Sequence, residues 1–219
     1  MTRAKPKRRA AGKRARTKSS ETTRRQLIDG AIEILRREGL NAATTGRIAQ
    51  AAGLKQPTFY AHFADRDEVL EAAAIEICRR MAEKLASHLT GFDLVDKAAS
   101  LRSTYEALVS GYLAHPELTR LFLRHRIDDG SPLGRVFSRF LASSRGLLSQ
   151  RFAKFIAAAG EECVNVHIEI LQANMLGVVE AIVEHRLQDR DLAVRAIIAA
   201  ESAALQWLRE QAQATVRAR

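Results

Sequence analysis

Apolar residues recur at intervals of three and four along almost the whole chain, which is the spacing of amphipathic helices. No strand-like alternation survives beside this pattern. With capping residues, prolines and glycines as boundaries, the pattern predicts about nine helices. They lie at about 22–38, 45–52, 56–63, from Asp65 or Asp67 to about 90, and at about 94–114, 116–126, 132–159, 161–187 and 190–215. We therefore expect an all-α fold, with an N-terminal helix-turn-helix head of three short helices and a C-terminal helical bundle.

Positive charge is concentrated at the N-terminus. The formal net charge is +10, and residues 1–20 hold nine Lys and Arg with no acidic residue. The remaining 199 residues carry 26 basic and 25 acidic side chains. We expect residues 1–20 to form a disordered basic arm, because such a segment repels itself and has little apolar surface to bury. Nucleic acid is its natural partner, since basic groups on phosphates release counterions, and a solubilising tail or cloning remnant is the alternative.

The remaining composition points to a cytoplasmic protein. Cys78 and Cys163 lie far apart and form no CxxC pair, so reduced thiols are expected. We find no apolar run near the roughly 18 residues of a membrane span, and no apolar segment follows the basic N-terminus as in a secretory signal. The six histidines show no metal-ligand spacing. We therefore expect no membrane partner, no metal and no cofactor.

The most informative stretch is 44–63. Thr44 can cap one short helix, and Gly53 permits a tight turn before the next, as a helix-turn-helix requires. The small core beneath would contain Ile48, Leu54, Phe59 and Phe63. The side chains left facing away are polar or have polar tips: Gln56, Thr58, Tyr60 and His62. Gln can bond adenine in two places, Thr can contact bases, and Tyr and His suit phosphate or sugar. The alternative is that Tyr60 and His62 merely cover the surface of the head.

Over about Arg24 to Leu70 the chain resembles the tetracycline-repressor (TetR) family of bacterial regulators. The matching motifs are Gly39, Thr44-Thr45, Ile48-Ala49, Ala52-Gly53, Thr58-Phe59-Tyr60, His62-Phe63 and Asp67 to Leu70. The resemblance implies a DNA-binding domain over 21–66 and a helical ligand-binding and dimerisation domain over 67–219. It also implies a palindromic double-stranded DNA operator, and a repressor that an unknown small-molecule effector releases.

The resemblance assigns roles to individual residues. Gln56, Pro57 and Thr58 would meet bases, and Tyr60 and His62 the DNA backbone. Arg66 would pair with a phosphate at the start of the long helix. The full set of expected DNA contacts is Thr45, Arg47, Lys55, Gln56, Pro57, Thr58, Tyr60, His62 and Arg66. Gly46 stands where the repressor that names the family has a base-reading arginine, so we expect a different operator sequence.

The candidates for an effector pocket combine apolar walls with a few polar tips, as ligand sites do. They are Met81, Tyr105, Leu108, Tyr112, Phe122, His125, Phe137, Phe140, Leu141, Asn174, Met175 and Val178. Residues at this spacing can equally be ordinary core. His125 with Arg124 and Arg126 would favour an acidic effector, or else form a solvated basic face.

The last two helices, at about 161–187 and 190–215, have apolar faces that look too wide for a single core partner. We therefore predict a homodimer in which two copies pair these helices into a four-helix bundle by two-fold symmetry. The alternative is that both faces are buried inside one protomer.

An enzyme is not expected. The sequence has no glycine-rich phosphate loop, no GxSxG, no metal cluster and no placed Cys–His pair. The competing function is a nucleoid-type DNA binder with little sequence preference, driven by the basic arm.

Overall fold

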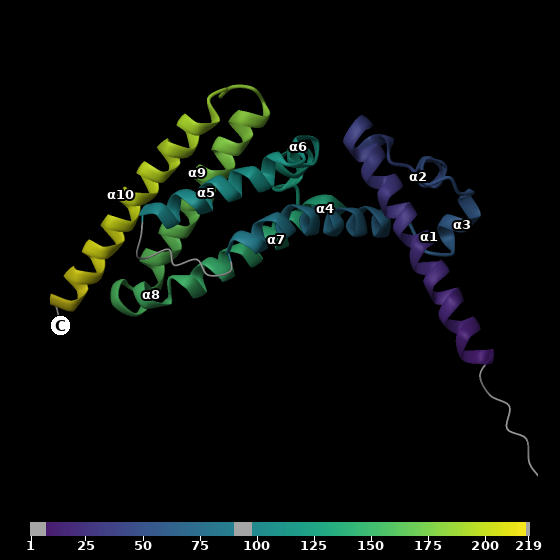
Figure 1. Ribbon diagram of the computed structural model, residues 1–219, viewed down its shortest axis with the longest axis horizontal. Coiled ribbons are helices and arrows are strands. Elements are labelled where there is room, and N and C mark those ends of the chain that lie inside the picture. Colours follow the sequence, from purple (N-terminus) through teal and green to yellow (C-terminus); the bar gives the residue numbers. More distant parts are fainter. Residues whose placement is uncertain (1–7, 90–97, 218–219) are drawn as a thin grey trace, which may run out of the picture. The chain divides into compact units, whose positions relative to one another are not determined.

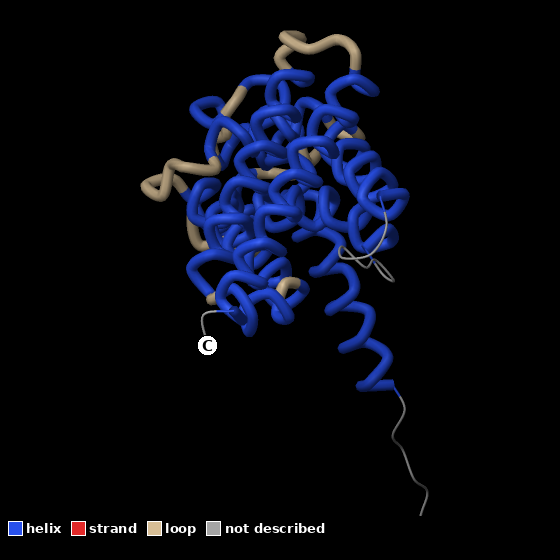
Figure 2. The backbone as a smooth tube through the Cα atoms, turned by 90° about the vertical axis from the view of Figure 1, so that its left-hand side faces the viewer, coloured by secondary structure: helices blue, strands red, loops and turns tan. Residues whose placement is uncertain are grey.

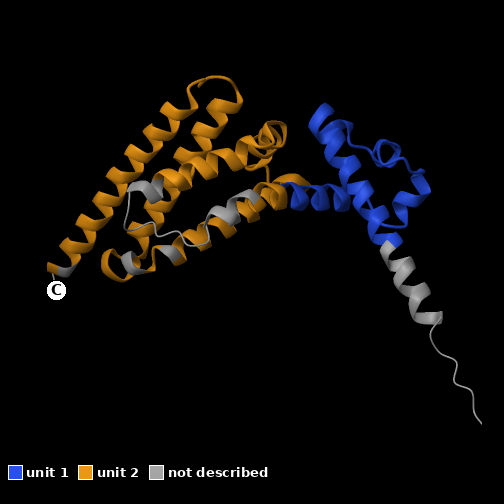
Figure 3. Ribbon diagram, viewed as in Figure 1, with its two compact units in different colours: residues 1–77 blue, residues 78–219 orange. Residues whose placement is uncertain are grey.

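The structure is a computed structural model that describes residues 8–89 and 98–217, and within these ranges helices are the only regular secondary structure (Figure 2). The chain divides into two compact units, a head over residues 1–77 and a body over residues 78–219 (Figure 3). The division falls inside the long helix α4 (Arg66–Leu89), whereas the sequence predicted a boundary at the start of this helix. The first turns of α4 belong to the head, where Val69, Leu70 and Ala73 are fully buried.

The head contains α1 (Arg8–Glu38), a 3₁₀ turn (Leu40–Ala42), α2 (Thr45–Ala51), α3 (Gln56–Tyr60) and the start of α4 (Figure 1). Helix α1 passes close to α2 at Gly30. A Cβ atom on Gly30 would lie 3.0 Å from the Ile48 carbonyl oxygen and 3.1 Å from the Ala52 nitrogen. Since both atoms are backbone and cannot swing aside, the absence of a side chain here permits the approach of the two helices.

The structure differs from the expected disordered arm. Residues 8–20 are the first turns of α1, which the sequence placed at about 22–38, while residues 1–7 lie outside the described residues. The physical reason is that the folded head already supplies a helix nucleus. Extending a formed helix costs far less than starting one, and Ala, Lys and Arg are all strong helix formers.

The body contains the rest of α4, α5 (Ala98–Leu113), α6 (Pro116–His125), α7 (Pro132–Arg151), α8 (Ala153–Ala159), α9 (Glu161–Val183) and α10 (Arg190–Arg217). Helix α10 packs against α5, α8 and α9, and α9 also contacts α5, α6 and α7. As predicted, Pro132 lies in the first turn of α7, and Ser131 caps the helix by accepting the Gly134 N–H at 3.0 Å.

One predicted helix, 132–159, is instead the pair α7 and α8, so the described residues form ten α-helices rather than about nine. The break falls at Phe152, whose backbone leaves helical geometry with φ −88° and ψ 11°. The Phe152 side chain is fully buried, and its ring lies edge-on to that of His167 with centroids 5.0 Å apart. Anchoring this ring in the core turns the chain, which helical periodicity alone does not reveal.

Helix α9 corrects the expectation that no segment is long and apolar enough to cross a membrane. By length and composition it meets that description, and it alone does so among the described residues. Buried core helices pass the same test, and one face of α9 is buried in the body through Val164, Ile168, Leu171 and Val179. This single helix is therefore weak evidence for a membrane.

The body has a polar cluster in its core, formed by Tyr105 of α5, His167 of α9 and Glu201 of α10. All three side chains are buried. His167 Nε2 lies 3.0 Å from Glu201 Oε1, within ion-pair distance but not aligned as a hydrogen bond, and His167 Nδ1 has no hydrogen-bond partner among the described residues. Burial, together with the charge and hydrogen bonding of Glu201, raises the pKa of Tyr105, so its hydroxyl stays protonated. Neither His167 nor Glu201 was predicted from the sequence.

We expect Glu201→Ala to lower the free energy of unfolding by roughly 3–5 kcal/mol, because it leaves the polar atoms of His167 and Tyr105 buried beside a void. Chemical denaturation measures the change. The matched control is Glu210→Ala on the exposed face of the same helix, which should cost about 0.5 kcal/mol or less. Equal losses in the two variants would contradict a structural role for the buried carboxylate.

Candidate nucleic-acid interface

Helices α2 and α3 are set by local signals that were predicted from the sequence. The Thr44 side chain caps α2 by accepting the Arg47 N–H at 3.4 Å, and Pro57 lies in the first turn of α3. Gly53 has φ 70°, in the left-handed region, and forms the turn between the helices. The turn is closed by the Leu54 N–H, which donates to the Ala49 carbonyl at 2.8 Å. Helix α3 ends at Tyr60, earlier than the predicted residue 63.

The inner side of α3 is held by aromatic packing. Phe59 and Phe63 are buried with ring centroids 5.7 Å apart, as predicted for the core of the head. The Arg24 guanidinium of α1 lies over the Phe63 ring, 4.6 Å from its centroid, in cation–π geometry. These contacts fix which side of α3 faces the solvent.

The outer side forms a connected polar surface, which we call the recognition strip: Thr45 of α2 with Gln56 and Tyr60 of α3. Gln56 Nε2 donates to Thr45 Oγ1 at 3.3 Å, and Thr45 Oγ1 lies 3.4 Å from the Tyr60 hydroxyl. Gln56 is exposed, and Tyr60 is 55% exposed. These long, solvent-exposed hydrogen bonds can be exchanged for bonds to a ligand at little cost.

The other expected DNA contacts surround the strip. Lys55 and Pro57 are exposed, while Thr58 and His62 are half-buried. Gly46 lies beside Gln56, since a Cβ on Gly46 would be 3.8 Å from Gln56 Oε1. This is ordinary contact distance, so a Cβ at residue 46 would fit without displacing Gln56.

The two arginines of the predicted set already have partners within the head. Arg47 is exposed and pairs with Glu38 at 2.6 Å. Arg66 is half-buried: its Nε donates to the Ala43 carbonyl at 2.7 Å and its Nη2 to the Leu40 carbonyl at 2.6 Å. Two of its five N–H donors are thus used to tie the start of α4 to the segment between α1 and α2, which leaves three for a phosphate.

The start of α4 is capped reciprocally, next to Arg66. Asp65 Oδ1 accepts the Glu68 N–H at 2.9 Å, and Glu68 Oε2 accepts the Ala64 N–H at 2.7 Å. This arrangement resembles a capping box and satisfies two N–H groups that the helix itself cannot.

We expect Arg66→Ala to lower the stability of the head by about 1–3 kcal/mol, since the Leu40 and Ala43 carbonyls lose a charged donor. Arg47→Ala, which removes an exposed ion pair, should cost about 1 kcal/mol or less. Native-state hydrogen exchange of the α2 amides reports on the head directly. If both variants left α2 equally protected, Arg66 would have no structural role.

The predicted effector residues are divided between the core and its edge, and only one of them is exposed. Phe122 is fully buried, and its ring lies 5.1 Å from Phe137, 6.1 Å from Phe140 and 6.2 Å from Tyr112, between centroids. Burial raises the pKa of Tyr112 to about 12. Of the other candidates, Met81, Tyr105 and Met175 are buried, Leu108, His125, Leu141 and Val178 are half-buried, and Asn174 is exposed.

The basic cluster around His125 is partly neutralised. Partial burial lowers the pKa of His125, and Arg124 lowers it further against an opposing effect of Asp128, so the imidazole is neutral near pH 7. Arg126 donates to the Leu123 carbonyl, and its Nη2 lies 3.5 Å from Glu180 Oε2. Glu180 thus offsets the charge of Arg126, while Arg124 remains exposed beside it.

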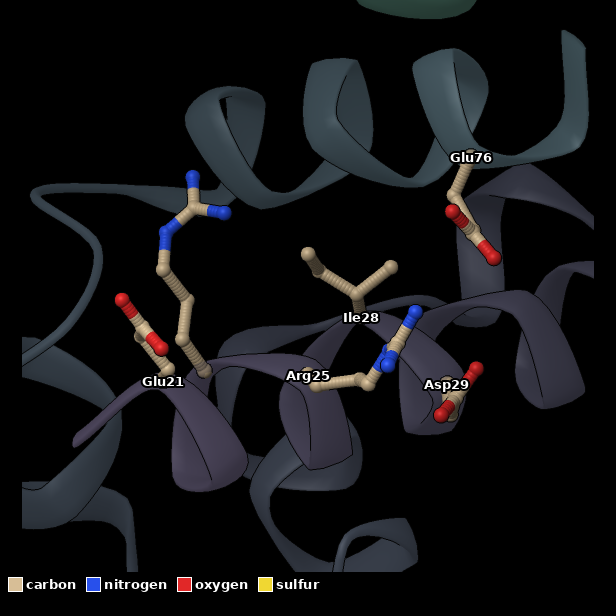
Figure 4. A pocket seen from close by; sticks show the side chains of 6 residues that line it. Glu21, Arg25, Ile28, Asp29 and Glu76 are labelled. Carbon is tan, nitrogen blue, oxygen red and sulfur yellow. The ribbon is translucent and has the colours of Figure 1, made fainter. Parts of the chain in front are cut away.

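Two hollows stand out in the described part of the chain, and neither is lined by a predicted site residue. One, of ≈ 280 Å³, belongs to the head; Figure 4 shows Ile28 between charged side chains of both signs, with Glu21, Arg25 and Asp29 on α1 and Glu76 on α4. The other, of ≈ 590 Å³, lies along α9 and is lined by Glu161, Glu162, Asn165, Val166, Glu169 and Ile170.

Comparison with known proteins relates the head to one family. Residues 27–73 match the family model described as bacterial regulatory proteins, tetR family. The chain is 40% identical over 57 residues to the tetracycline repressor protein class D of Escherichia coli. This match covers 26% of each chain, so only about a quarter of the relative's length is spanned. The matched family is one of regulators, in agreement with the prediction that the chain is not an enzyme.

Solved structures extend the likeness to the whole fold. A putative transcriptional regulator from Pseudomonas aeruginosa superposes with a TM-score of 0.67 at 20% identity, covering 91% of this chain and 95% of that one. A SmeT–triclosan complex superposes with a TM-score of 0.60 at 19% identity, covering 82% and 91%. The predicted fold class, a helix-turn-helix head followed by a helical body, is confirmed.

Proposed function

We propose, since the chain belongs to the tetR family of bacterial regulatory proteins, that it is a sequence-specific DNA-binding transcriptional regulator that acts as a repressor. The observation that carries this proposal is the recognition strip, an exposed polar surface on a helix whose other side is anchored by Phe59 and Phe63. An outward polar face on a rigid short helix is what reading a major groove requires.

In this proposal α3 enters the major groove. Gln56, Pro57 and Thr58 meet base edges at the start of the helix, where side chains reach deepest. The backbone contacts come from Thr45, Arg47, Lys55, Tyr60, His62 and Arg66. Binding requires Gln56 and Tyr60 to exchange their hydrogen bonds with Thr45 for bonds to DNA. The chain works in the cytoplasm, where its operator lies.

A homodimer would bind a palindromic operator through two such heads. The expected interface is formed by the last two helices, at about 161–187 and 190–215. A two-fold operator mirrors a two-fold protein, and the distance between the two recognition helices must match the groove repeat.

A small-molecule effector bound in the body would release the DNA by favouring a state in which the distance between the two recognition helices no longer matches the groove repeat. Support for such a ligand comes from the SmeT–triclosan complex, a structure of the same fold. The candidate contacts are the predicted residues of the body, of which Asn174 is exposed and His125, Phe140 and Val178 are half-buried.

The test is to incubate fragments of the host's genomic DNA with the purified full chain and to sequence the fragments that it binds. We expect one palindromic motif, bound at least about 10³-fold more tightly than bulk DNA. In the same assay, Gln56→Ala should relax base preference at one position per half-site, at a loss of roughly 1–3 kcal/mol. Gln150→Ala, on the exposed face of α7, is the control and should leave the motif unchanged. Uniform protection of all sequences would support the nucleoid-type binder instead.

The basic segment is expected to strengthen binding to every sequence. Deleting residues 1–20 removes nine positive charges and should flatten the dependence of log affinity on log salt, by about 0.9 for each phosphate that the segment neutralises. Replacing the six basic residues of 8–20 with glutamine tests charge separately, because glutamine keeps the helix propensity. An unchanged slope in both variants would show that the segment does not bind DNA.

A further inference from the structure

Glu38 is the last residue of α1, and its carboxylate pairs with Arg47 of α2. Arg47 Nη2 lies 2.6 Å from each of the two carboxylate oxygens. A carboxylate at this end of a helix is unfavourable, because the unpaired carbonyl groups there carry partial negative charge. Arg36 and Arg37, just before it, have the sign of charge that the helix end favours. The helix that carries Glu38 therefore does not explain why an acidic residue stands there.

The ion pair occupies only one edge of the Arg47 guanidinium. Both hydrogen bonds to Glu38 come from Nη2, which leaves Nε and Nη1 with three N–H groups for another acceptor. Arg66 likewise uses two of its donors within the head, on the carbonyls of Leu40 and Ala43. The difference lies in charge: neutral carbonyls leave the charge of Arg66 in place, whereas the carboxylate of Glu38 offsets that of Arg47.

The affinity for bulk DNA and the affinity for one operator depend on an arginine in different ways. Binding to any sequence is driven by net charge, because each positive group near a phosphate releases counterions wherever that phosphate lies. A hydrogen bond to one particular phosphate needs donors held at a fixed place, and it sets the position of the protein on the duplex. An arginine that is neutralised and anchored contributes little to the first and keeps the second.

We propose that Glu38 is a specificity-determining residue of the DNA-binding head. It offsets the charge that would attract Arg47 to any DNA, and it holds the guanidinium where a correctly placed phosphate meets three N–H groups. The proposal rests on the proposed function and concerns the ratio of operator affinity to bulk affinity. Glu38 acts through Arg47 and is therefore a positioning residue.

The test is Glu38→Gln in the full chain, which removes the charge and keeps the size of the side chain. Fluorescence anisotropy measures binding to two labelled duplexes, the motif from the genomic selection and a fragment without it. We expect affinity for the second to rise roughly fivefold per bound head at about 0.15 M salt, and its dependence on log salt to steepen by about 0.9. Operator affinity should stay within about twofold of wild type, because ordering a free arginine offsets the added charge.

Glu33→Gln is the matched control for the loss of one negative charge. The Glu33 side chain is 42% exposed, as is that of Glu38, but it pairs within α1 with Arg36 and Arg37, which are outside the predicted DNA contacts. This variant should leave both affinities within about 1.5-fold of wild type, because salt limits exposed charges to a short range.

A second control removes Arg47 itself. In an Arg47→Gln background, adding Glu38→Gln should change neither affinity further, because two residues that act through one contact are not additive. Equal tightening on both duplexes, an unchanged salt dependence on bulk DNA, the same change in Glu33→Gln, or an effect that persists without Arg47 would each overturn the role of Glu38. Failure of the proposed function looks different: the selection with wild type would then return no motif, and the bulk-DNA measurements would still report on Glu38.

Discussion

Burial of Phe59 and Phe63 is the interaction on which the reading surface of the head depends. Helices α2 and α3 have seven and five residues, well below the roughly 12–15 that a helix needs to persist alone in water. They exist because α2 packs against α1 and α3 packs against α2, with Ile48 and Phe59 fully buried. In so short a helix, anchoring one aromatic ring fixes the rotation of the whole element. The outward placement of Gln56 and Tyr60 is therefore a consequence of the core.

How far the sequence predicts the head depends on the range of each signal. Thr44, Gly53 and Pro57 act within a few residues, and each has its predicted role. Arg66 contacts carbonyls 23 and 26 residues earlier in the chain, and no local pattern reveals such a contact. The close approach at Gly30 is hidden for the same reason, because the atoms that exclude a side chain belong to another helix.

In the body, helical periodicity predicted the elements but not what each face contacts. Tyr112, Phe122 and Phe140 have the spacing of a pocket lining and also of a core, and in the structure their rings pack on one another. Asn174 has the same periodic spacing and is exposed. The pairing of His167 with Glu201 joins residues 34 positions apart on different helices, so only the tertiary fold reveals it. The breadth of the apolar face was the more informative signal, since α9 and α10 have apolar residues on their exposed side as well as on their buried side.

Helices α9 and α10 bury two ionisable side chains, His167 and Glu201, among apolar ones, and each exposes some large apolar side chains. A purely apolar seam between α9 and α10 could slip by one turn at little cost, since one aliphatic contact resembles the next. A slip of one turn, about 5.4 Å, would move His167 away from the height of Glu201. The buried His167–Glu201 pair opposes such a slip, because any other register leaves a carboxylate in the core without its partner. Buried polar groups play this part in coiled coils, where they lower the stability but fix one alignment of the helices along each other.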